Sequence, residues 1–319
     1  MTVVTVLIPT HGRPTLLGRT LASLGACRLP AGFAEVVVVE NGSQAGAEAV
    51  VAEAAEAHPC LRLRYLHVEW ANKSHALNEA LSTVGEGLSV FFDDDVRFEA
   101  GVLEAYAAAA NKTSVGHYYG GSMGVDYERE PPDWVRRLLP LSARGMDLHE
   151  KEREWHLYLG CNWAAFAQDV RAVGGFNADF GPGSPTGATG QEAEMQERLL
   201  ARGVRQVDVP DALVWHYVPE ERSTLRWLIR RKYRGGTQHG QTAYASGDPK
   251  ALDEMRGHLV RCGLSTAKRT LLLDRAGWWQ AFLALSYWVG AWQGYRKSSA
   301  DPNTVDSRLL ELVDSKESA

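Results

Sequence analysis

The chain has 319 residues, with 34 Lys and Arg against 39 Asp and Glu, so its net charge at neutral pH is −5. A hydrophobic fraction of 45% with 23% charged residues is typical of a soluble globular protein and excludes a disordered chain or a small disulfide scaffold. The acidic balance argues against a general nucleic-acid-binding protein. Four widely spaced cysteines without a CxxC pair indicate separate thiols in a reducing compartment: Cys27, Cys60, Cys161 and Cys262.

The first 110 residues alternate short apolar runs with helical stretches rich in alanine and leucine. Strands are predicted over residues 3–9, 34–43, 61–69 and 88–96, and helices over residues 14–27, 45–58, 72–84 and 100–110. Continuous apolar strands that alternate with helices predict a mostly parallel sheet covered on both faces. The first apolar run is too short for a signal peptide or a membrane span. A ligand of such a sheet binds at the carboxyl ends of its strands.

The following part of the chain is less regular. A Gly- and Tyr-rich stretch over 117–125 precedes a polar stretch over 126–156, a strand and helix over 160–176, a glycine loop over 181–190, a helix over 192–203 and β structure over 205–218. Helical patterns occupy the chain beyond residue 249 and lead to a polar tail that starts near residue 296.

Asp93, Asp94 and Asp95 follow a buried apolar strand and are the sharpest chemical signal in the chain. Because side chains alternate along a strand, we expect Asp93 and Asp95 on one face and Asp94 on the other. Two carboxylates on one face supply the hard oxygen ligands that Mg²⁺ and Mn²⁺ prefer, and such an ion bridges a diphosphate. The alternative is an acidic turn before the next helix.

Two further strand ends bring polar side chains to the same edge of the predicted sheet. Glu40 and Asn41 end the second strand, and Thr10, His11 and Arg13 follow the first. Three strand ends that converge on hydrogen-bonding groups are expected of a nucleotide pocket. The Glu40 carboxylate could accept the N3–H of a uracil or thymine ring, or it could cap the following turn.

Five stretches of the chain occur in an order that resembles the family 2 glycosyltransferases, which have the GT-A fold. They run from residue 6 to about 240, roughly three quarters of the chain: VLIPTHGRPTLLGRTLASL, VVVVENGS, NKSHALNEALSTVGEGLSVFFDDDV, GCNWAAFAQDVRAVGGFN and GATGQEAEMQERLLARGVRQVDVPDALVWHYVPEERS. Each stretch alone is weakly specific, but five in register are a specific signal. The resemblance implies an α/β fold of the GT-A type, in which helices flank a Rossmann-like and mostly parallel sheet, here with a C-terminal helical appendage.

The resemblance also implies an activity. Such enzymes move a sugar from a nucleoside-diphosphate sugar to an acceptor hydroxyl or amine, and we expect inversion at the sugar, UDP or dTDP as the nucleotide, and Mg²⁺ or Mn²⁺ as cofactor. The acceptor, a glycan, lipid or small molecule, is not identified by the sequence. On this basis a catalytic domain covers 1–240, with a nucleotide-sugar half (1–110) and an acceptor half (111–240), followed by a helical extension (241–295) and a polar tail (296–319).

The same resemblance implies roles for individual residues. The donor-binding positions of the family correspond to Pro9, Thr10, Arg13, Glu40, Asn41, Lys73, Asn78, Asp93 and Asp94. Glu40 stands where the family usually has Asp. Asp93 and Asp95 match the ends of the family's DxD motif, and His216 matches a position that contacts the metal or the diphosphate. These three residues are the expected metal ligands. A purely structural role is the alternative for His216. Gly160, Asn162 and Trp163 are expected on the acceptor side.

The catalytic base is expected at the start of the helix after the glycine loop. Family members usually read Gly-Glu-Asp-x-Glu-Leu there, and this chain reads Gly-Gln-Glu-Ala-Glu-Met over residues 190–195. Glu192 therefore takes the place of the usual Asp and would remove the proton of the acceptor hydroxyl. The alternative is an acidic residue that is favourable in the first turn of a helix. Glu194 points in another direction on the same helix.

A cationic segment follows His216 in the sequence. Arg222, Arg230 and Arg231 are predicted to belong to a loop that closes over the diphosphate, and a solvated basic helix face is the alternative. Aromatic side chains that could stack on a sugar acceptor, or pack in a minor core, are His117, Tyr118, Tyr119, Trp134 and Trp155.

Residues 276–295 carry no charge and include four of the ten tryptophans. We expect a packing or dimer-forming helix there, with a peripheral membrane contact as the second interpretation and a membrane span as the last. The expected location is the cytoplasm. If the segment contacts a membrane, we expect it to do so at the cytoplasmic face. No nucleic-acid partner is expected.

Two other functions compete with sugar transfer. A catalytically degenerate protein that only binds nucleotide sugars is indicated by Gln191, which replaces an acidic residue of the family pattern. A sugar nucleotidylyltransferase would require a GxGxR-type loop after the first strand, and the chain has PTHGRPT at that place.

Overall fold

The structure is a computed structural model that describes residues 1–113, 115–150, 157–185 and 189–300. The chain forms two compact units, each of which contains two segments of the sequence. The sheet unit comprises Met1–Asp126 and Arg144–Tyr217. The helical unit comprises Tyr127–Ala143 and the chain from Val218 onward. The predicted domain boundaries at residues 110, 240 and 295 remain predictions.

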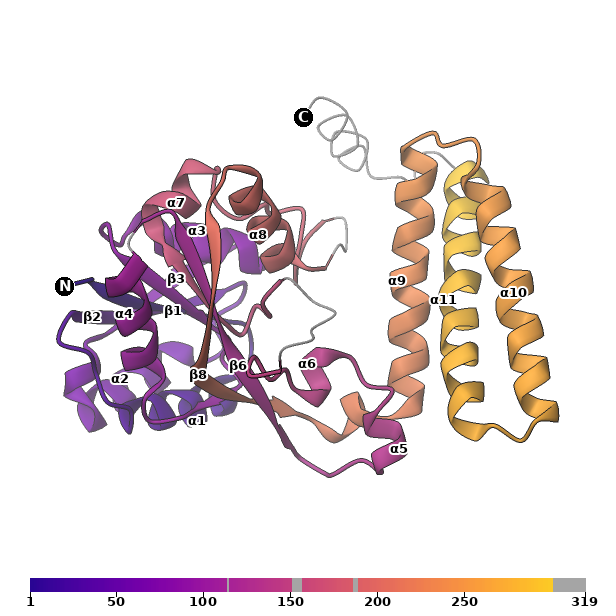
Figure 1. Ribbon diagram of the computed structural model, residues 1–319. Helices are drawn as coiled ribbons and strands as arrows, with labels where there is room; N and C mark the ends of the chain where they lie inside the picture. Colours follow the sequence, from indigo (N-terminus) through magenta and orange to yellow (C-terminus); the bar gives the residue numbers. More distant parts are fainter. Residues whose placement is uncertain (114, 151–156, 186–188, 301–319) are drawn as a thin grey trace. The chain divides into compact units, whose positions relative to one another are not determined.

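One mixed sheet of eight strands, among the described residues, forms the centre of the sheet unit, in the order β3-β2-β1-β4-β7-β6-β8-β5 (Figure 1). The strands are β1 (Val4–Thr10), β2 (Phe33–Asn41), β3 (Leu63–Val68), β4 (Leu88–Phe92), β5 (Val96–Phe98), β6 (His117–Tyr127), β7 (Asn162–Phe166) and β8 (Arg205–Val218). The first four pair in parallel, whereas β7 is antiparallel to both β4 and β6. Every residue of β1 is buried, as expected for a central strand with a parallel neighbour on each side.

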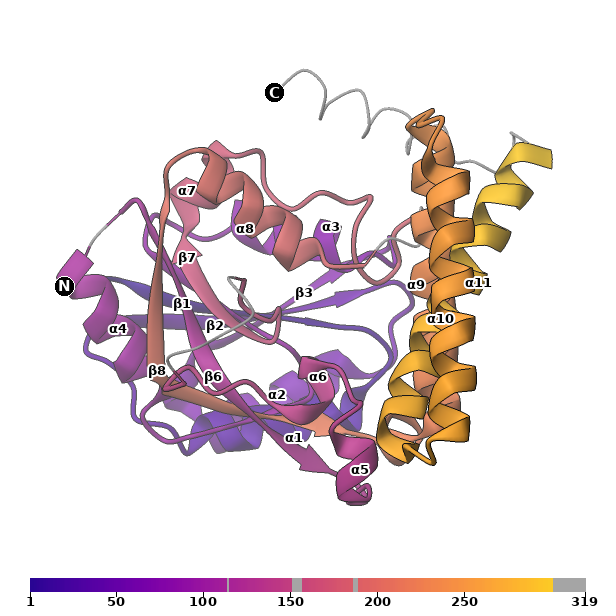
Figure 2. The same ribbon diagram turned by 45° about the vertical axis from the view of Figure 1, so that its right-hand side comes forward.

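Helices cover both faces of this sheet, which confirms the predicted α/β fold (Figure 2). They are α1 (Pro14–Gly25), α2 (Ala47–Ala57), α3 (Lys73–Ser82), α4 (Val102–Thr113), α7 (Ala167–Ala172) and α8 (Gln191–Ala201), with a 3₁₀ turn, η1, at Pro59–Leu61. Alternate residues of β1 point to opposite faces: Ile8 packs with α1, α2 and α4, whereas Leu7 packs with α3, α7 and α8. Two apolar cores therefore hold the sheet.

Strand β6 is an element that the sequence pattern did not predict, because glycine is unfavourable in the interior of a strand. Its glycines are required by close neighbours. A Cβ atom at Gly121 would lie 1.9 Å from the carbonyl oxygen of Ala212 in β8, and one at Gly120 would lie 1.9 Å from the ring of Tyr158. The polar stretch that follows contains the short helices α5 (Asp133–Arg136) and α6 (Leu141–Arg144).

The helical unit contains η2 (Glu220–Ser223) and three long helices, α9 (Leu225–Ala245), α10 (Ala251–Leu271) and α11 (Arg275–Ala300). Glycines bring α9 and α11 into backbone contact: a Cβ atom at Gly236 would lie 1.8 Å from the Tyr287 carbonyl oxygen, and one at Gly294 would lie 2.1 Å from that of Thr237. The uncharged segment 276–295 lies within α11, which packs against α9 and α10. No helix in the described part of the chain is long and apolar enough to cross a membrane.

Candidate active site

The three adjacent carboxylates lie in a turn between β4 and β5. The predicted strand over 88–96 ends at Phe92, so the expected alternation of the three side chains across a strand is wrong. Two hydrogen bonds to the backbone hold the turn: Thr20 Oγ1 donates to the Asp94 carbonyl (2.9 Å), and the Tyr217 N–H donates to the Asp95 carbonyl (2.8 Å). Helix α1 and strand β8 thus fix the carboxylates from two sides.

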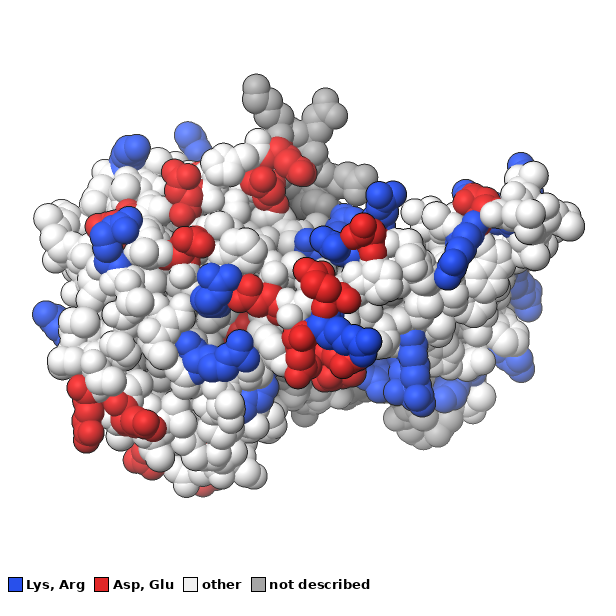
Figure 3. Space-filling model, turned by 90° about the horizontal axis from the view of Figure 1, so that it is seen from below, with Lys and Arg blue, Asp and Glu red and all other residues white. Residues whose placement is uncertain are grey.

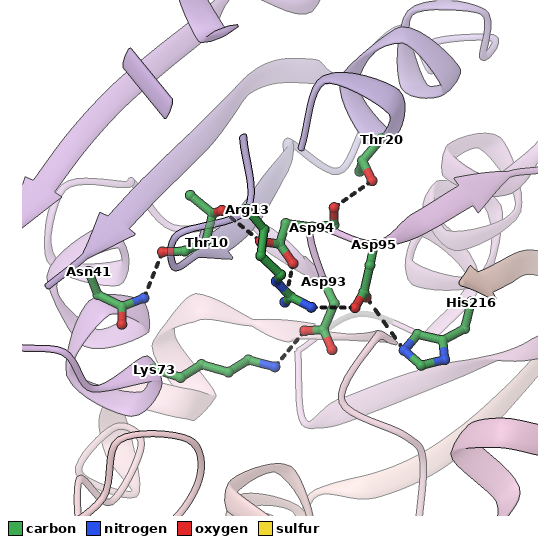
Figure 4. A network of polar contacts seen from close by, with 9 residues as sticks. All are labelled: Thr10, Arg13, Thr20, Asn41, Lys73, Asp93, Asp94, Asp95 and His216. Atoms are coloured by element: carbon green, nitrogen blue, oxygen red, sulfur yellow. Dashed lines mark hydrogen bonds and ion pairs between the residues drawn. The ribbon is translucent and has the colours of Figure 1, made fainter. Parts of the chain in front are cut away.

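Arg13 binds two of these carboxylates (Figure 4). Its guanidinium pairs with Asp94 Oδ1 through one nitrogen and with Asp95 Oδ2 through the other, at 2.7 Å. Thr10 Oγ1 donates a hydrogen bond of 2.6 Å to the second oxygen of Asp94. Complete burial nevertheless raises the pKa of Asp94 to about 6, against the opposing effect of Arg13.

Lys73, the first residue of α3, forms an ion pair with Asp93. Asn72 caps this helix, since its side chain accepts the N–H of His75 at 2.9 Å, and so places Lys73 beside the turn. Burial would raise the pKa of Asp93, but the adjacent Lys73 charge holds that pKa below its ordinary value. Asp93 is therefore an anion in the folded protein.

His216 reaches the cluster from β8, opposite Val96 of β5. Its Nε2 lies 3.5 Å from Asp95 Oδ1. Asp95 Oδ1 and His216 Nδ1 are both buried, and neither has a hydrogen-bond partner among the residues that the structure describes. Buried polar atoms are rarely left unpaired, so Asp95 Oδ1, on the side where it faces His216 Nε2, has room for a further partner. The described residues contain no group of three or more His, Cys, Asp or Glu side chains already arranged around a metal position.

Glu192 lies in the first turn of α8, next to Gly160. A Cβ atom at Gly160 would lie 3.0 Å from the Glu192 carboxyl carbon, so a larger residue would crowd this side chain. Burial raises the pKa of Glu192, and the charge of Lys73 opposes this effect. Glu194 points elsewhere, as the helical spacing predicted, and it pairs with Arg198 at 2.7 Å.

At the end of β2, Glu40 and Asn41 are buried and hydrogen-bonded within the protein. Glu40 accepts the Ala45 N–H at 2.7 Å and the Tyr65 hydroxyl at 2.6 Å, so the turn-capping interpretation of this residue is observed. Burial and this hydrogen bond raise the pKa of Tyr65 to about 12. Asn41 donates to the carbonyl of Thr10 at 2.9 Å and ties β2 to β1. The preceding residue of β1, Pro9, is buried.

Three predicted site residues are engaged elsewhere. Asn78 pairs with the backbone of Phe176, donating to its carbonyl (2.8 Å) and accepting its N–H (2.7 Å). Asn162 accepts the Tyr106 hydroxyl at 2.7 Å, and its amide group donates to two backbone carbonyls. Trp163 is buried in the core with its ring 4.5 Å from that of Phe91. The structure therefore brings only Gly160 of the expected acceptor-side residues to the cluster.

The predicted diphosphate loop is helical, which corrects that expectation. Arg222 lies in η2, and Arg230 and Arg231 lie in α9. Arg231 is 5.3 Å from the ring centre of Trp227. All three arginines belong to the helical unit, and their role toward a diphosphate remains a prediction.

The aromatic candidates for acceptor stacking divide between the two units. Tyr118 and Tyr119 are buried in the sheet unit, and His117 is the first residue of β6. Trp134 packs against Arg275 in the helical unit, at 4.6 Å. Trp155 lies outside the described residues.

The sequence reasoning missed Thr20, whose hydroxyl holds the carboxylate turn. A signal was present, because Thr20 is a polar residue on the apolar face of α1 formed by Leu17, Leu21 and Leu24. Tyr217 was also missed; it acts through its backbone N–H, for which no side-chain pattern gives a signal.

Three comparisons with known proteins agree with this fold and identify a family. The sequence model of the family described as "Glycosyl transferase family 2" matches residues 5–174. Succinoglycan biosynthesis protein ExoM of Rhizobium meliloti (strain 1021) is 27% identical over 238 residues, which cover 73% of this chain and 72% of that protein. Validoxylamine A glucosyltransferase of Streptomyces hygroscopicus subsp. jinggangensis (strain 5008) is 29% identical over 225 residues, 62% of this chain and 51% of that enzyme. The aligned region thus spans about half of the latter protein.

Solved structures share the fold at low sequence identity. The mannosyltransferase PcManGT from Pyrobaculum calidifontis, in complex with GDP-Man and Mn²⁺, has a TM-score of 0.52 and 22% identity, covering 99% of this chain and 80% of its own. GalNAc-T7 with UDP, GalNAc and Mn²⁺ has a TM-score of 0.51 and 16% identity, covering 68% and 43%.

Proposed function

The chain belongs to glycosyl transferase family 2, and we propose that it transfers a sugar from a UDP- or dTDP-sugar to a hydroxyl or amine of an acceptor. The observation that carries the proposal is the cluster in which Arg13, Lys73 and the carboxylates of Asp93–Asp95 meet beside Glu192. It lies at the carboxyl end of β4, the edge at which open α/β sheets bind ligands. The glucosyltransferase of Streptomyces hygroscopicus, to which the chain is similar, and the sugar nucleotide in the PcManGT structure support this class of reaction.

Asp93, Asp95 and His216 would hold a divalent ion, Mg²⁺ or Mn²⁺. Asp95 Oδ1, which has no hydrogen-bond partner among the described residues, and His216 Nε2, 3.5 Å from it, fit this role, as carboxylate and imidazole ligands suit Mn²⁺. A bound ion would supply positive charge for the diphosphate leaving group. Mn²⁺ in two structures with the same fold supports the proposal.

Arg13 and Lys73 supply positive charge from the protein itself. Each is held by carboxylates of the turn, so their positions are set before a ligand arrives. A guanidinium and an ammonium group both bind phosphate oxygens through charge-assisted hydrogen bonds. We assign both side chains to binding of the donor diphosphate. The diphosphate would compete for them with the carboxylates that hold them in this structure.

Glu192 would act as the general base. Its carboxylate takes the proton of the acceptor hydroxyl while that oxygen attacks the anomeric carbon, and the nucleoside diphosphate leaves from the opposite face. This geometry inverts the configuration of the sugar. Burial favours this role because a raised pKa makes the carboxylate a stronger base.

The Glu40 carboxylate is assigned to the nucleotide base, because carboxylate oxygens can accept more than one hydrogen bond each. Uracil and thymine offer N3–H to such an acceptor. We also place the enzyme in the cytoplasm, since its four cysteines are unpaired, as is usual in a reducing compartment.

A thermal-shift screen of UDP-, dTDP- and GDP-sugars with and without Mn²⁺ tests the donor. We expect a rise in melting temperature with a UDP- or dTDP-sugar that depends on Mn²⁺ and is lost in Asp95→Asn. A response to GDP-sugars alone would overturn the choice of base, and no response to any donor would overturn the function. Hydrolysis of the bound donor separates an enzyme from a protein that only binds nucleotide sugars.

A further inference from the structure

The last residue of α10 and the turn that follows it, together called the leucine turn, present three consecutive leucines to solvent. Leu271, Leu272 and Leu273 are 85%, 65% and 91% exposed. A single exposed leucine is ordinary, but three adjacent ones at the tip of a helical pair form an apolar surface that folding leaves uncovered.

The turn is built so that these leucines stay outside. Leu273 has a φ of 52°, in the left-handed region that residues other than glycine rarely adopt. The next residue, Asp274, accepts the Gly277 N–H at 3.0 Å as the cap of α11 and also pairs with Arg269 of α10. These contacts fix both ends of the turn, so its leucines cannot fold back onto the helices without breaking them.

The apolar surface continues along the outer face of α10. Val260 is 61% exposed and Leu264 is 67% exposed. At 100° per residue, positions 260, 264 and 271 fall within about 40° of one another around the helix. One narrow apolar stripe therefore leads along α10 to the leucine turn.

The three long helices of the helical unit, one of which carries this stripe, are strongly basic. Residues 225–300 contain thirteen Lys and Arg and only four Asp and Glu, a net charge of +9 in a chain whose total is −5. Arg256, Arg261 and Lys268 are exposed on α10 itself. Figure 3 shows the side chains of Lys and Arg distributed over the right-hand part of the molecule, the helical unit, where few Asp and Glu appear.

A tryptophan lies next to the leucine turn. The indole N–H of Trp278 donates to Thr270 Oγ1 at 2.9 Å, across the turn, and its ring stacks on Phe282 with the ring centres 5.0 Å apart. Tryptophan is favoured at the level of lipid headgroups, where its ring is in an apolar region and its N–H has a polar partner.

We propose that the outer face of α10 and the leucine turn dock on an anionic phospholipid bilayer, with Leu271–Leu273 inserted below the headgroups. Apolar insertion combined with basic residues is the pattern by which proteins bind the surface of a membrane without crossing it. A second copy of the chain is a poorer occupant, because two copies of this basic face would bring like charges together. The proposal is independent of the sugar-transfer reaction.

Co-sedimentation of the full chain with vesicles tests the proposal. The probes are vesicles of phosphatidylcholine alone and of phosphatidylcholine with 30% phosphatidylglycerol, each at low and high salt. We expect binding to the anionic vesicles that weakens as salt rises, and little binding to the neutral ones. The variant Leu271→Asn/Leu273→Asn should lower the partition coefficient by about tenfold for each leucine.

The control is Leu200→Asn, which changes a leucine that is 40% exposed on α8 of the sheet unit and should leave vesicle binding unchanged. Both replaced turn residues are exposed, so circular dichroism should show an intact fold. Equal binding of the wild type and the turn variant, or no binding of the wild type to anionic vesicles, would overturn the proposal. A dimer seen by analytical ultracentrifugation and lost in the turn variant would replace the bilayer by a second copy.

Discussion

The sheet unit and the helical unit achieve close packing in different ways. In the sheet unit, branched side chains such as Val36 and Val38 fill the space between strands and helices. In the helical unit, α9 and α11 meet through Gly236, Gly240 and Gly290, so backbone touches backbone. Apolar periodicity therefore predicts the first kind of packing, whereas the second is built from residues that usually indicate a helix end.

The two units also differ in where their charged side chains lie. The sheet unit buries Asp94 and Asp95 and nearly buries Lys73 and Asp93, each with an opposite partner. The helical unit keeps its many basic groups at the surface. Substitutions of charged residues should thus change activity most in the sheet unit, and substitutions of glycine should change stability most in the helical unit.

The largest expected effect is that of Glu192→Gln. Loss of the general base should lower kcat by roughly 10²- to 10⁴-fold. The melting temperature should be maintained, because the substitution removes a buried charge whose pKa burial already raises. A radiolabelled-sugar transfer assay measures the effect, with Glu194→Gln on the same helix as the control that keeps activity. Full turnover in the Glu192 variant would show that another residue is the base.

Gly236→Ala tests the glycine contact between α9 and α11. The added methyl group would lie 1.8 Å from the Tyr287 carbonyl oxygen, so the helices must separate, at a cost of about 1–3 kcal/mol in the free energy of unfolding. Urea denaturation followed by tryptophan fluorescence measures it, because several tryptophans lie in α11. An unchanged transition midpoint would mean that the helices are not packed as closely as described.

The pH dependence of kcat should show an acid limb. The base acts when it is deprotonated, and burial raises its pKa above the usual 4.5, so kcat should fall about tenfold per pH unit below that raised value. Measurements between pH 4.5 and 8 locate the limb. If the residual activity of Glu192→Gln shows the same limb, the titrating group is Asp94, whose pKa burial raises to about 6.

Gly235→Ala has the smallest expected effect and the opposite sign. A Cβ atom there would be 3.7 Å from the nearest atom of Tyr287, an ordinary contact, so the change should stabilise α9 by up to about 1 kcal/mol. Measured beside Gly236→Ala in the same denaturation experiment, it separates helix propensity from packing. If Gly235→Ala and Gly236→Ala both destabilised the protein, the proposed difference in packing between Gly235 and Gly236 would be wrong.

Much of the sheet unit was predictable because its signals are local. The apolar runs of β1 and β2 and the helix between them follow directly from the period of their residues. The convergence of Arg13 with Asp94 and Asp95 was predicted in outline from strand order and from resemblance.

The remaining features depend on partners that are distant in the sequence. Asn162 belongs to the core because its amide meets carbonyl groups from β6 and β8, which no local pattern shows. The run of basic residues after Arg222 resembled a ligand-binding loop. It lies in a helix instead, because Gly236 and Gly240 of α9 are buried against another helix, which begins 30 residues after α9 ends. Burial of this kind depends on tertiary packing, which single-sequence periodicity does not describe.

The pairing of strand β5 with β8 means that the site is completed late during synthesis of the chain. Val96 emerges from the ribosome early, but its partner in the sheet, His216, follows 120 positions later. The turn that carries the carboxylates lacks this neighbour and the Tyr217 hydrogen bond until β8 has been made. At ribosomal rates of about 5–20 residues per second, the nascent chain spends several seconds with an incomplete site. The carboxylate site of the growing polypeptide is therefore complete only after β8, the last strand of the sheet, has been synthesised.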